Sequence, residues 1–241
     1  MTSQTERYAL ITGASSGIGR ATALAFAQAG IHLALVSRTQ SKLEAVAAAA
    51  TQYGVKVRCY PVDLLQVEHV REKIAAIATS FGPLDILVNN AGMGYTAMLS
   101  DTPLADWQRV LTLNLTSVFQ CIQGILPTMR ERRQGTIINV SSIAGQQVFP
   151  AWGAYCVSKF GLVALSKTLA AEERQRGIRV VTISPGSVNT PLWDTDTVHA
   201  DFDRASMLTP ETVAQSILYT ALLPQEAVVE ELTLMPNAGT F

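Results

Sequence analysis

Short, nearly all-apolar runs alternate with longer stretches of helical periodicity along almost the whole chain. The expected strands are Tyr8–Thr12, His32–Ser37, Lys56–Pro61, Asp85–Asn89, Thr136–Ser141, Arg179–Ser184 and Glu231–Met235. The expected helices are Gly19–Ala29, Ser41–Tyr53, Val67–Phe81, Leu104–Arg132, Ala154–Arg176 and Pro210–Leu223. Apolar strands indicate a parallel sheet buried on both faces, and the alternation requires crossover connections. The pattern predicts an α/β fold: a doubly wound (Rossmann) parallel sheet of about seven strands with helices on both faces.

One domain is expected over residues 1–241. No tract rich in Pro, Gly or Ser and no block of like charge divides the chain, and no internal repeat is visible. Hydrophobic residues make up 48% and charged residues 15%, enough apolar material for a large core. The formal net charge of -1 gives no general attraction to nucleic acid or anionic membranes, so neither is an expected partner.

The cysteines and the apolar runs bear on the compartment. Cys59, Cys121 and Cys156 are odd in number and widely spaced, which indicates a reducing environment. The three histidines are equally scattered, so no metal site is expected. No signal peptide is visible, and Gly, Pro, Asn or charged residues interrupt every apolar run before about 18 residues. We therefore expect a cytoplasmic protein without a membrane span.

A glycine-rich turn follows the first strand, with the sequence Thr12-Gly13-Ala14-Ser15-Ser16-Gly17-Ile18-Gly19. Gly13 permits the tight turn, Gly17 lets a pyrophosphate approach the backbone, and Gly19 lets the helix pack close to the sheet. The free N–H groups at the helix start suit phosphate oxygens. Because the turn joins the first strand to the first helix, it predicts a dinucleotide site.

The end of the second strand bears on the choice of dinucleotide. An NAD enzyme needs an acidic residue here to accept hydrogen bonds from the ribose hydroxyls. This chain has Ser37 and Arg38 instead, and a guanidinium suits a 2′-phosphate. The stretch favours NADP(H), although an arginine in such a loop is also simply solvated in many proteins.

Three side chains suited to proton transfer are expected to meet at the carboxyl edge of the sheet. Tyr155 and Lys159 lie four residues apart on one helix and so share a face, and Ser142 follows the fifth strand. A carbonyl reduction needs a proton donor for oxygen, which Tyr155 can supply. We expect the Lys159 charge to lower the phenol pKa, and Ser142 to hydrogen-bond the carbonyl oxygen.

The order and spacing of these motifs resemble the short-chain dehydrogenase/reductase superfamily over residues 7 to 236. The resemblance is carried by Thr12–Gly19, Asp63, Asn89-Asn90-Ala91-Gly92, Asn114, Ser142, Tyr155, Lys159 and Pro185-Gly186. It implies oxidoreductase activity, with Tyr155 as proton donor or acceptor and Lys159 also holding the nicotinamide ribose. It further implies that Ser142 positions the substrate and that Asn114 holds a water through its backbone.

The same resemblance implies a set of contacts to the cofactor. Asp63 and Leu64 would lie by the adenine, and Val188 and Thr190 would meet the carboxamide. The full implied set is Gly13, Ser15, Ser16, Gly17, Ile18, Gly19, Ser37, Arg38, Asp63, Leu64, Asn90, Ala91, Gly92, Tyr155, Lys159, Pro185, Gly186, Val188 and Thr190. Single members have simpler interpretations: Asp63 also suits a helix N-cap, and Asn89-Asn90 a turn.

The substrate is less constrained. Tyr95, Phe149, Trp152 and Trp193 fall in segments expected to line an apolar pocket, although helix packing explains such residues as well. A lid is expected around 191–208. Its acidic residues, which disfavour a carboxylate substrate beside the single Arg204, are Asp194, Asp196, Asp201 and Asp203.

The sequence is similar to 3-oxoacyl thioester reductases and carbonyl reductases, which implies a small carbonyl or alcohol substrate. Arg133 and Arg176 fall where such acyl reductases dock an acyl carrier protein, but Leu232–Gly239 departs from their usual ending. The resemblance also implies a homodimer through the helices Leu104–Arg132 and Ala154–Arg176, or a homotetramer. Two alternatives remain open: a non-catalytic NADP-binding redox sensor, and a dehydrogenase of sterol-like or sugar alcohols.

Overall fold

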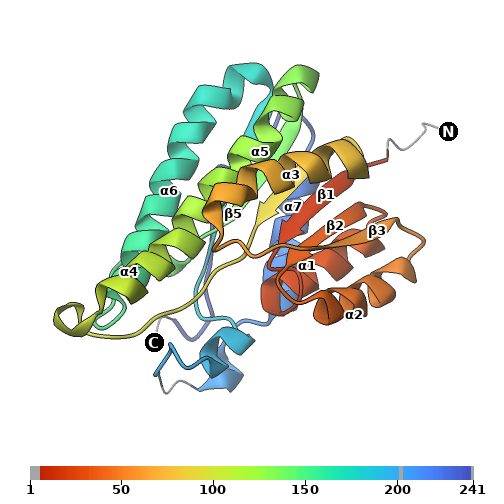
Figure 1. The fold of residues 1–241 in the computed structure, drawn as a ribbon. Coiled ribbons are helices and arrows are strands. Elements are labelled where there is room, and N and C mark those ends of the chain that lie inside the picture. The colour runs from red at the N-terminus through yellow and green to blue at the C-terminus, as the bar shows by residue number, and fades with distance from the viewer. Residues whose placement is uncertain (1–5, 201–202, 240–241) are drawn as a thin grey trace.

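A computed structural model describes residues 6–200 and 203–239 and contains one seven-stranded, entirely parallel sheet (Figure 1). The strands are β1 (Tyr8–Thr12), β2 (His32–Ser37), β3 (Val57–Pro61), β4 (Ile86–Asn89), β5 (Gly135–Val140), β6 (Ile178–Pro185) and β7 (Glu231–Leu234). Their order is β3-β2-β1-β4-β5-β6-β7. The chain leaves β1 in one direction and returns to β4 on its other side, which makes the β1–β4 junction the topological switch point.

Helices cover both faces of the sheet. They are α1 (Gly17–Gln28), α2 (Gln40–Thr51), α3 (Val67–Phe81), α4 (Leu104–Leu111), α5 (Ser117–Arg132), α6 (Gly153–Glu173) and α7 (Pro210–Leu222). One core lies between the sheet and α1, α2 and α7, and the other between the sheet and α3, α5 and α6. The predicted fold class is confirmed, and all seven strands lie within a residue or two of their expected bounds.

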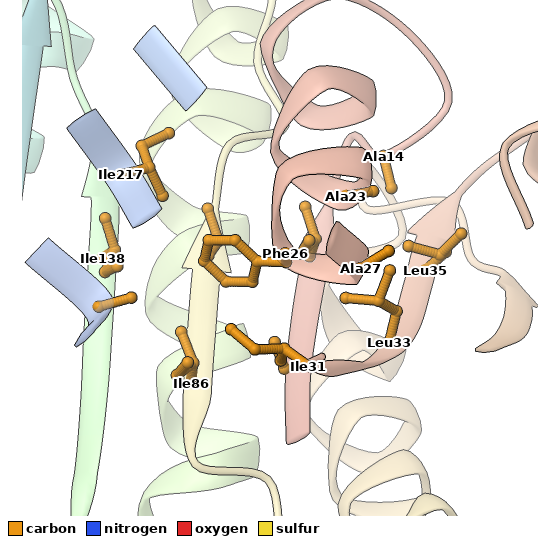
Figure 2. Packing of buried hydrophobic residues seen from close by; sticks show 14 of the residues in the cluster. Ala14, Ala23, Phe26, Ala27, Ile31, Leu33, Leu35, Ile86, Ile138 and Ile217 are labelled. Carbon is orange, nitrogen blue, oxygen red and sulfur yellow. The ribbon is translucent and has the colours of Figure 1, made fainter. Parts of the chain in front are cut away.

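Phe26 of α1 lies at the centre of the first core, among side chains from the sheet and from α7 (Figure 2). It is fully buried, and so are Ala23 and Ala27, one turn before it and one residue after it. The small alanines let α1 lie close to the strands, while the ring fills the space between Ile86 and Ile217. This packing fixes the direction in which the N-terminus of α1 points.

The prediction of one continuous helix over Leu104–Arg132 was wrong. The segment is interrupted by a π-helical turn at Thr112–Thr116, which separates α4 from α5. A π turn holds one extra residue, and sequence periodicity does not reveal so small an insertion. The helix expected to run to Arg176 likewise ends at Glu173 and continues as a 3₁₀ turn.

The same segment is the one helical stretch of the described residues that is long and apolar enough to cross a membrane. Within Leu104–Arg132 an 18-residue window reaches a mean hydropathy of 1.3. The search of the sequence for uninterrupted apolar runs does not detect this stretch. Half of that window is buried, and α5 packs against α3. Burial of this kind is what a core helix requires, so its apolar composition is explained by the fold.

Candidate active site

The glycine turn lies at the carboxyl end of β1, beside the switch point. Gly13 has a φ of 65°, and a Cβ there would come within 2.8 Å of the Asn90 amide nitrogen. A Cβ on Gly19 would collide with the Gly13 carbonyl oxygen and lie 2.5 Å from the same amide nitrogen. Any side chain at either position would therefore force the first turn of α1 away from β1 and β4.

Thr12 and Asn90 hold this turn together. The buried Thr12 hydroxyl donates to the Val88 carbonyl and accepts hydrogen bonds from the backbone N–H groups of Asn90 and Ala91. The Asn90 amide donates to the carbonyls of Thr12 and Gly13, at 3.0 and 3.4 Å. Asn90 thus joins the ends of β1 and β4, a structural task that the sequence did not assign to it.

The N-terminus of α1 presents donors suited to an anion. Ser16 is its N-cap and is exposed, and within the described residues its side chain makes no capping hydrogen bond. The first backbone N–H groups of the helix are thus open to phosphate oxygens. Gly17, with a φ of 50°, follows directly, and Ser15 is half-buried beside it. This part of the site fits the pyrophosphate of a dinucleotide.

The end of β2 fits the 2′-phosphate of an NADP(H) molecule. The Ser37 hydroxyl is buried and has no hydrogen-bond partner among the described residues. Arg38 is exposed and makes no ion pair or hydrogen bond within the described part of the chain. Beside them, the Asp63 carboxylate accepts a hydrogen bond from the Leu65 N–H, which closes a turn after β3, and Leu64 is buried. An unpaired hydroxyl next to a free guanidinium suits a phosphate better than a neutral ribose.

Ser142, Tyr155 and Lys159 come together where β5 ends and α6 begins. Ser142 and Tyr155 line one cavity of about 150 Å³ and hydrogen-bond to each other. Lys159 is buried, with its Nζ 5.7 Å from the centre of the Tyr155 ring and 2.9 Å from the Val140 carbonyl oxygen, to which it donates. The expected convergence of hydroxyl, phenol and ammonium is present in the structure.

The protonation states differ from the sequence-based expectation. Burial raises the pKa of the Tyr155 phenol to about 12, although its hydrogen bond with Ser142 acts in the opposite direction. Burial also lowers the pKa of Lys159 to about 8. The expected lowering of the phenol pKa was wrong for the free protein, because burial has the largest effect on Tyr155 and the Lys159 ammonium donates to the Val140 carbonyl.

Asn114 lies in the π-helical turn and is fully buried. Its side chain accepts a hydrogen bond from the Met93 N–H and donates to the Met93 carbonyl and to the Ser158 hydroxyl, at 2.8, 2.9 and 3.0 Å. The Ser158 hydroxyl in turn donates to the Tyr155 carbonyl. The sequence analysis did not single out Ser158, although a serine three residues after Tyr155 on a buried helix face is a usable signal.

The cavity wall has two parts. Ile18, Pro185, Gly186, Val188 and Thr190 line the side nearer the glycine turn, where the sequence expected the nicotinamide. The aromatic residues expected for the substrate, Phe149, Trp152 and Trp193, line the same cavity, and the Trp193 indole donates to the Val188 carbonyl. The sequence missed Ser187, whose buried hydroxyl in this wall has no partner among the described residues.

One expectation about the surroundings of the cavity changes, and Gly92 is found close to two predicted site residues. Tyr95 is not among the residues that line it, because its hydroxyl donates to Asp106 on α4 instead. Gly92 lies beside the catalytic group, since a Cβ there would be 3.2 Å from the Asn114 Oδ1 and 3.8 Å from the Lys159 Nζ. Of the acidic lid residues, Asp201 lies outside the described residues.

Comparison with known proteins identifies a matching family and similar reductases. A family model described as short chain dehydrogenase matches residues 7–200. The chain is 35% identical over 237 residues to the sepiapterin reductase of Chlorobaculum tepidum, covering 95% of this chain and 96% of that protein.

Two solved structures have the same fold and carry a related cofactor. An alcohol dehydrogenase from the archaeon Thermococcus sibiricus, complexed with 5-hydroxy-NADP, is 29% identical with a TM-score of 0.88, covering 96% of this chain and 97% of that one. A variant of actinorhodin polyketide ketoreductase with NADPH is 28% identical with a TM-score of 0.88, and the match covers 100% of both chains.

The burial of Lys159 has a measurable effect on stability. The folded protein releases this proton near pH 8, whereas the unfolded chain keeps it until about pH 10.5, so the unfolded state binds more protons between these values. Stability of the wild type therefore rises with pH across this window. Lys159→Met removes the penalty, and we expect it to raise the free energy of unfolding at pH 7 by up to about 3 kcal/mol. The difference from wild type should shrink between pH 8 and 10.5.

Urea unfolding at a series of pH values measures this difference. The exposed Lys42 on α2 offers the matched control, since Lys42→Met should leave the pH dependence unchanged. A Lys159→Met variant that is less stable than wild type at pH 7, with a difference independent of pH, would contradict the assignment.

Proposed function

This chain belongs to the short-chain dehydrogenase family, and we propose that it reduces the carbonyl group of a small organic molecule to an alcohol with NADPH. The proposal rests on one observation: Ser142 and Tyr155 line one cavity beside an uncapped helix N-terminus, and the buried Lys159 Nζ lies 5.7 Å from the centre of the Tyr155 ring. A protein that only senses the cofactor has no need of this group. The redox-sensor alternative is therefore less favoured.

The catalytic roles follow from the positions of the side chains. When bound, NADPH supplies a hydride to the carbonyl carbon. Ser142 donates a hydrogen bond to the carbonyl oxygen, and Tyr155 donates its proton to the same atom as negative charge develops there. Lys159 stabilises the phenolate that remains, because its ammonium lies close to the ring.

The protonated state of Tyr155 suits the donor role that carbonyl reduction requires. A phenol with a pKa of about 12 is fully protonated at neutral pH and is ready to donate. An alkoxide is a much stronger base than a phenolate, so this donation remains downhill.

The protein surface favours a free small molecule as the substrate over a substrate that is carried by an acyl carrier protein. Arg133 donates to the Gln175 carbonyl, and Arg176 pairs with the buried carboxylate of Glu173. Both lie beyond the far ends of α5 and α6, and the 21 residues of α6 span about 31 Å from the Tyr155 end. Docking by an acyl carrier protein at Arg133 and Arg176 stays a prediction.

We also propose a cytoplasmic homo-oligomer. Phe119 of α5 and Val157 and Phe160 of α6 are large apolar side chains exposed on neighbouring helices, and Tyr219 and Leu222 are exposed on α7. Apolar side chains gathered on a surface suggest an interface. Pairing of α5 and α6 would give a dimer, and a second contact through α7 and β7 a tetramer.

Light scattering at micromolar concentration tests the assembly. We expect the mass of a dimer or tetramer for the wild type and a smaller mass for Phe119→Glu/Phe160→Glu, because two buried charges would oppose the helix pairing. Lys42→Glu on the exposed face of α2 controls for a general charge effect. A monomeric wild type would refute the proposal.

Substitution of Tyr155 tests the chemistry. Tyr155→Phe removes the transferable proton and keeps the ring, so turnover with a carbonyl substrate should fall about 10²-fold or more. NADPH binding, followed by the fluorescence of the cofactor, should be nearly unchanged. Retention of most of the activity would overturn the role, and loss of NADPH binding would show that Tyr155 is structural instead.

Substitution of Arg38 tests the cofactor preference. A hydrogen bond to a charged group contributes roughly 1.5–3 kcal/mol, so Arg38→Ala should weaken NADPH binding by about 10- to 150-fold while NADH binding stays almost unchanged. Arg38→Lys should fall between, since it keeps the charge but loses the forked donors. Titration of both cofactors measures this; equal losses for NADPH and NADH would place the preference elsewhere.

A further inference from the structure

We infer that the preferred substrates are uncharged aryl carbonyl compounds whose ring packs against Trp152 and Trp193 while the carbonyl oxygen meets Ser142 and Tyr155. The inference rests on the proposed carbonyl reduction and narrows its substrate class. It is drawn from the arrangement of rings and charges around the cavity.

Three aromatic rings form a row that starts at the proton donor. The Tyr155 and Trp152 rings are 5.4 Å apart at 66°, and the Trp152 and Trp193 rings are 5.8 Å apart at 69°. Phe149 adds a fourth ring to the same cavity. Edge-to-face contacts at these distances are favourable, and an aryl group entering the cavity can add the same kind of contact. A saturated group of equal size gains burial but not this term.

The outer ring is held in place before any substrate arrives. The Trp193 indole N–H donates to the Val188 carbonyl at 2.8 Å, so that this donor is already engaged. The lid that carries Trp193 is fastened to the loop after β4, because the Thr197 hydroxyl donates to the Gly94 carbonyl and the Thr96 N–H donates to the Thr197 carbonyl. A wall fixed in this way loses little entropy when a ring packs on it.

The charges around the cavity select against anions. Among the described residues that line it, none carries a charge. The lid cation Arg204 is bonded to Asp194, Asn189 and the Thr190 carbonyl, and Lys159 donates to the Val140 carbonyl. A carboxylate in the cavity would therefore lose its water without gaining a free cation, which is strongly unfavourable.

Two matched pairs of compounds test the inference. Acetophenone and cyclohexyl methyl ketone differ in the aromaticity of one ring, and ethyl benzoylformate and benzoylformate differ in one charge. Binding is measured by calorimetry on the protein loaded with tetrahydro-NADP, whose nicotinamide is uncharged and cannot transfer a hydride, and reduction by the loss of NADPH absorbance. We expect acetophenone to bind about 2- to 13-fold tighter than its saturated partner. The ester should bind about 100-fold or more tighter than the acid.

The tryptophans provide variants with an internal control. Trp152→Leu and Trp193→Leu keep an apolar side chain but remove the ring, and each should reduce the preference for acetophenone over cyclohexyl methyl ketone toward equality. Trp107 on α4 is not among the residues that line the cavity, so Trp107→Leu should keep the preference. Because the readout is a ratio within each variant, a general loss of stability does not imitate the effect.

The outcomes separate this inference from the proposed function. Reduction of both ketones without preference, or equal binding of acid and ester, overturns the inference and leaves carbonyl reduction standing. A preference that survives both tryptophan substitutions also overturns it. Ring-selective binding with no NADPH oxidation for any of the compounds supports the aromatic wall and overturns the proposed reductase activity.

Discussion

The hydroxyl of Thr12 joins the carboxyl ends of β1 and β4, and the rest of the site depends on this junction. In a doubly wound sheet these two strands diverge toward helices on opposite faces, which opens a crevice between them. Thr12 and Asn90 fix the crevice edges with five hydrogen bonds, each of them to a backbone N–H or carbonyl group. Only glycine at positions 13 and 19 leaves room for this arrangement, so α1 starts where its free N–H groups face the crevice.

A second polar chain sets the catalytic half of the site. Asn89 donates to Asn139 across neighbouring strands, Asn139 donates to Ser166 of α6, and Ser166 donates to the Leu162 carbonyl. Buried chains of this kind are specific because each member that loses its partner is left unsatisfied. The chain fixes α6 against β5, and Ser142 at the end of β5 then meets Tyr155 in the first turn of α6. Lys159 is buried by the same packing, so the geometry that assembles the site also shifts its protonation equilibria.

How far the sequence alone predicts this structure depends on whether the deciding contact is local. The strand His32–Ser37 was predicted to the residue because polar side chains stand at both of its ends, whereas β5 begins one residue earlier, at Gly135, and β6 ends one residue later, at Pro185, than composition alone predicts. Ser142, Tyr155 and Lys159 could be selected from the sequence because Ser142 follows a predicted strand and the other two lie four residues apart on the predicted helix after it. The π turn at Asn114, the hydrogen bonds of Asn90 and the raised pKa of Tyr155 could not be predicted in this way. Each depends on a partner far along the chain or on burial, which no local pattern encodes.

The two halves of the crevice are built from different kinds of group. The half beside β1 and β2 is mainly backbone, glycine and a short polar stretch, and it suits a ligand part that is common to many enzymes. The half beside α6 is made of large side chains. Trp193 is held there by the lid, whose hydrogen bonds run to two other loops, at the Val188 and Gly94 carbonyls. Loops of this kind tolerate sequence change far better than the sheet does. The two halves meet at Val188 and Thr190, whose carbonyls accept hydrogen bonds from the Trp193 indole and from Arg204 of the lid. Changes in the lid that keep these contacts can therefore redirect substrate choice without disturbing the cofactor half.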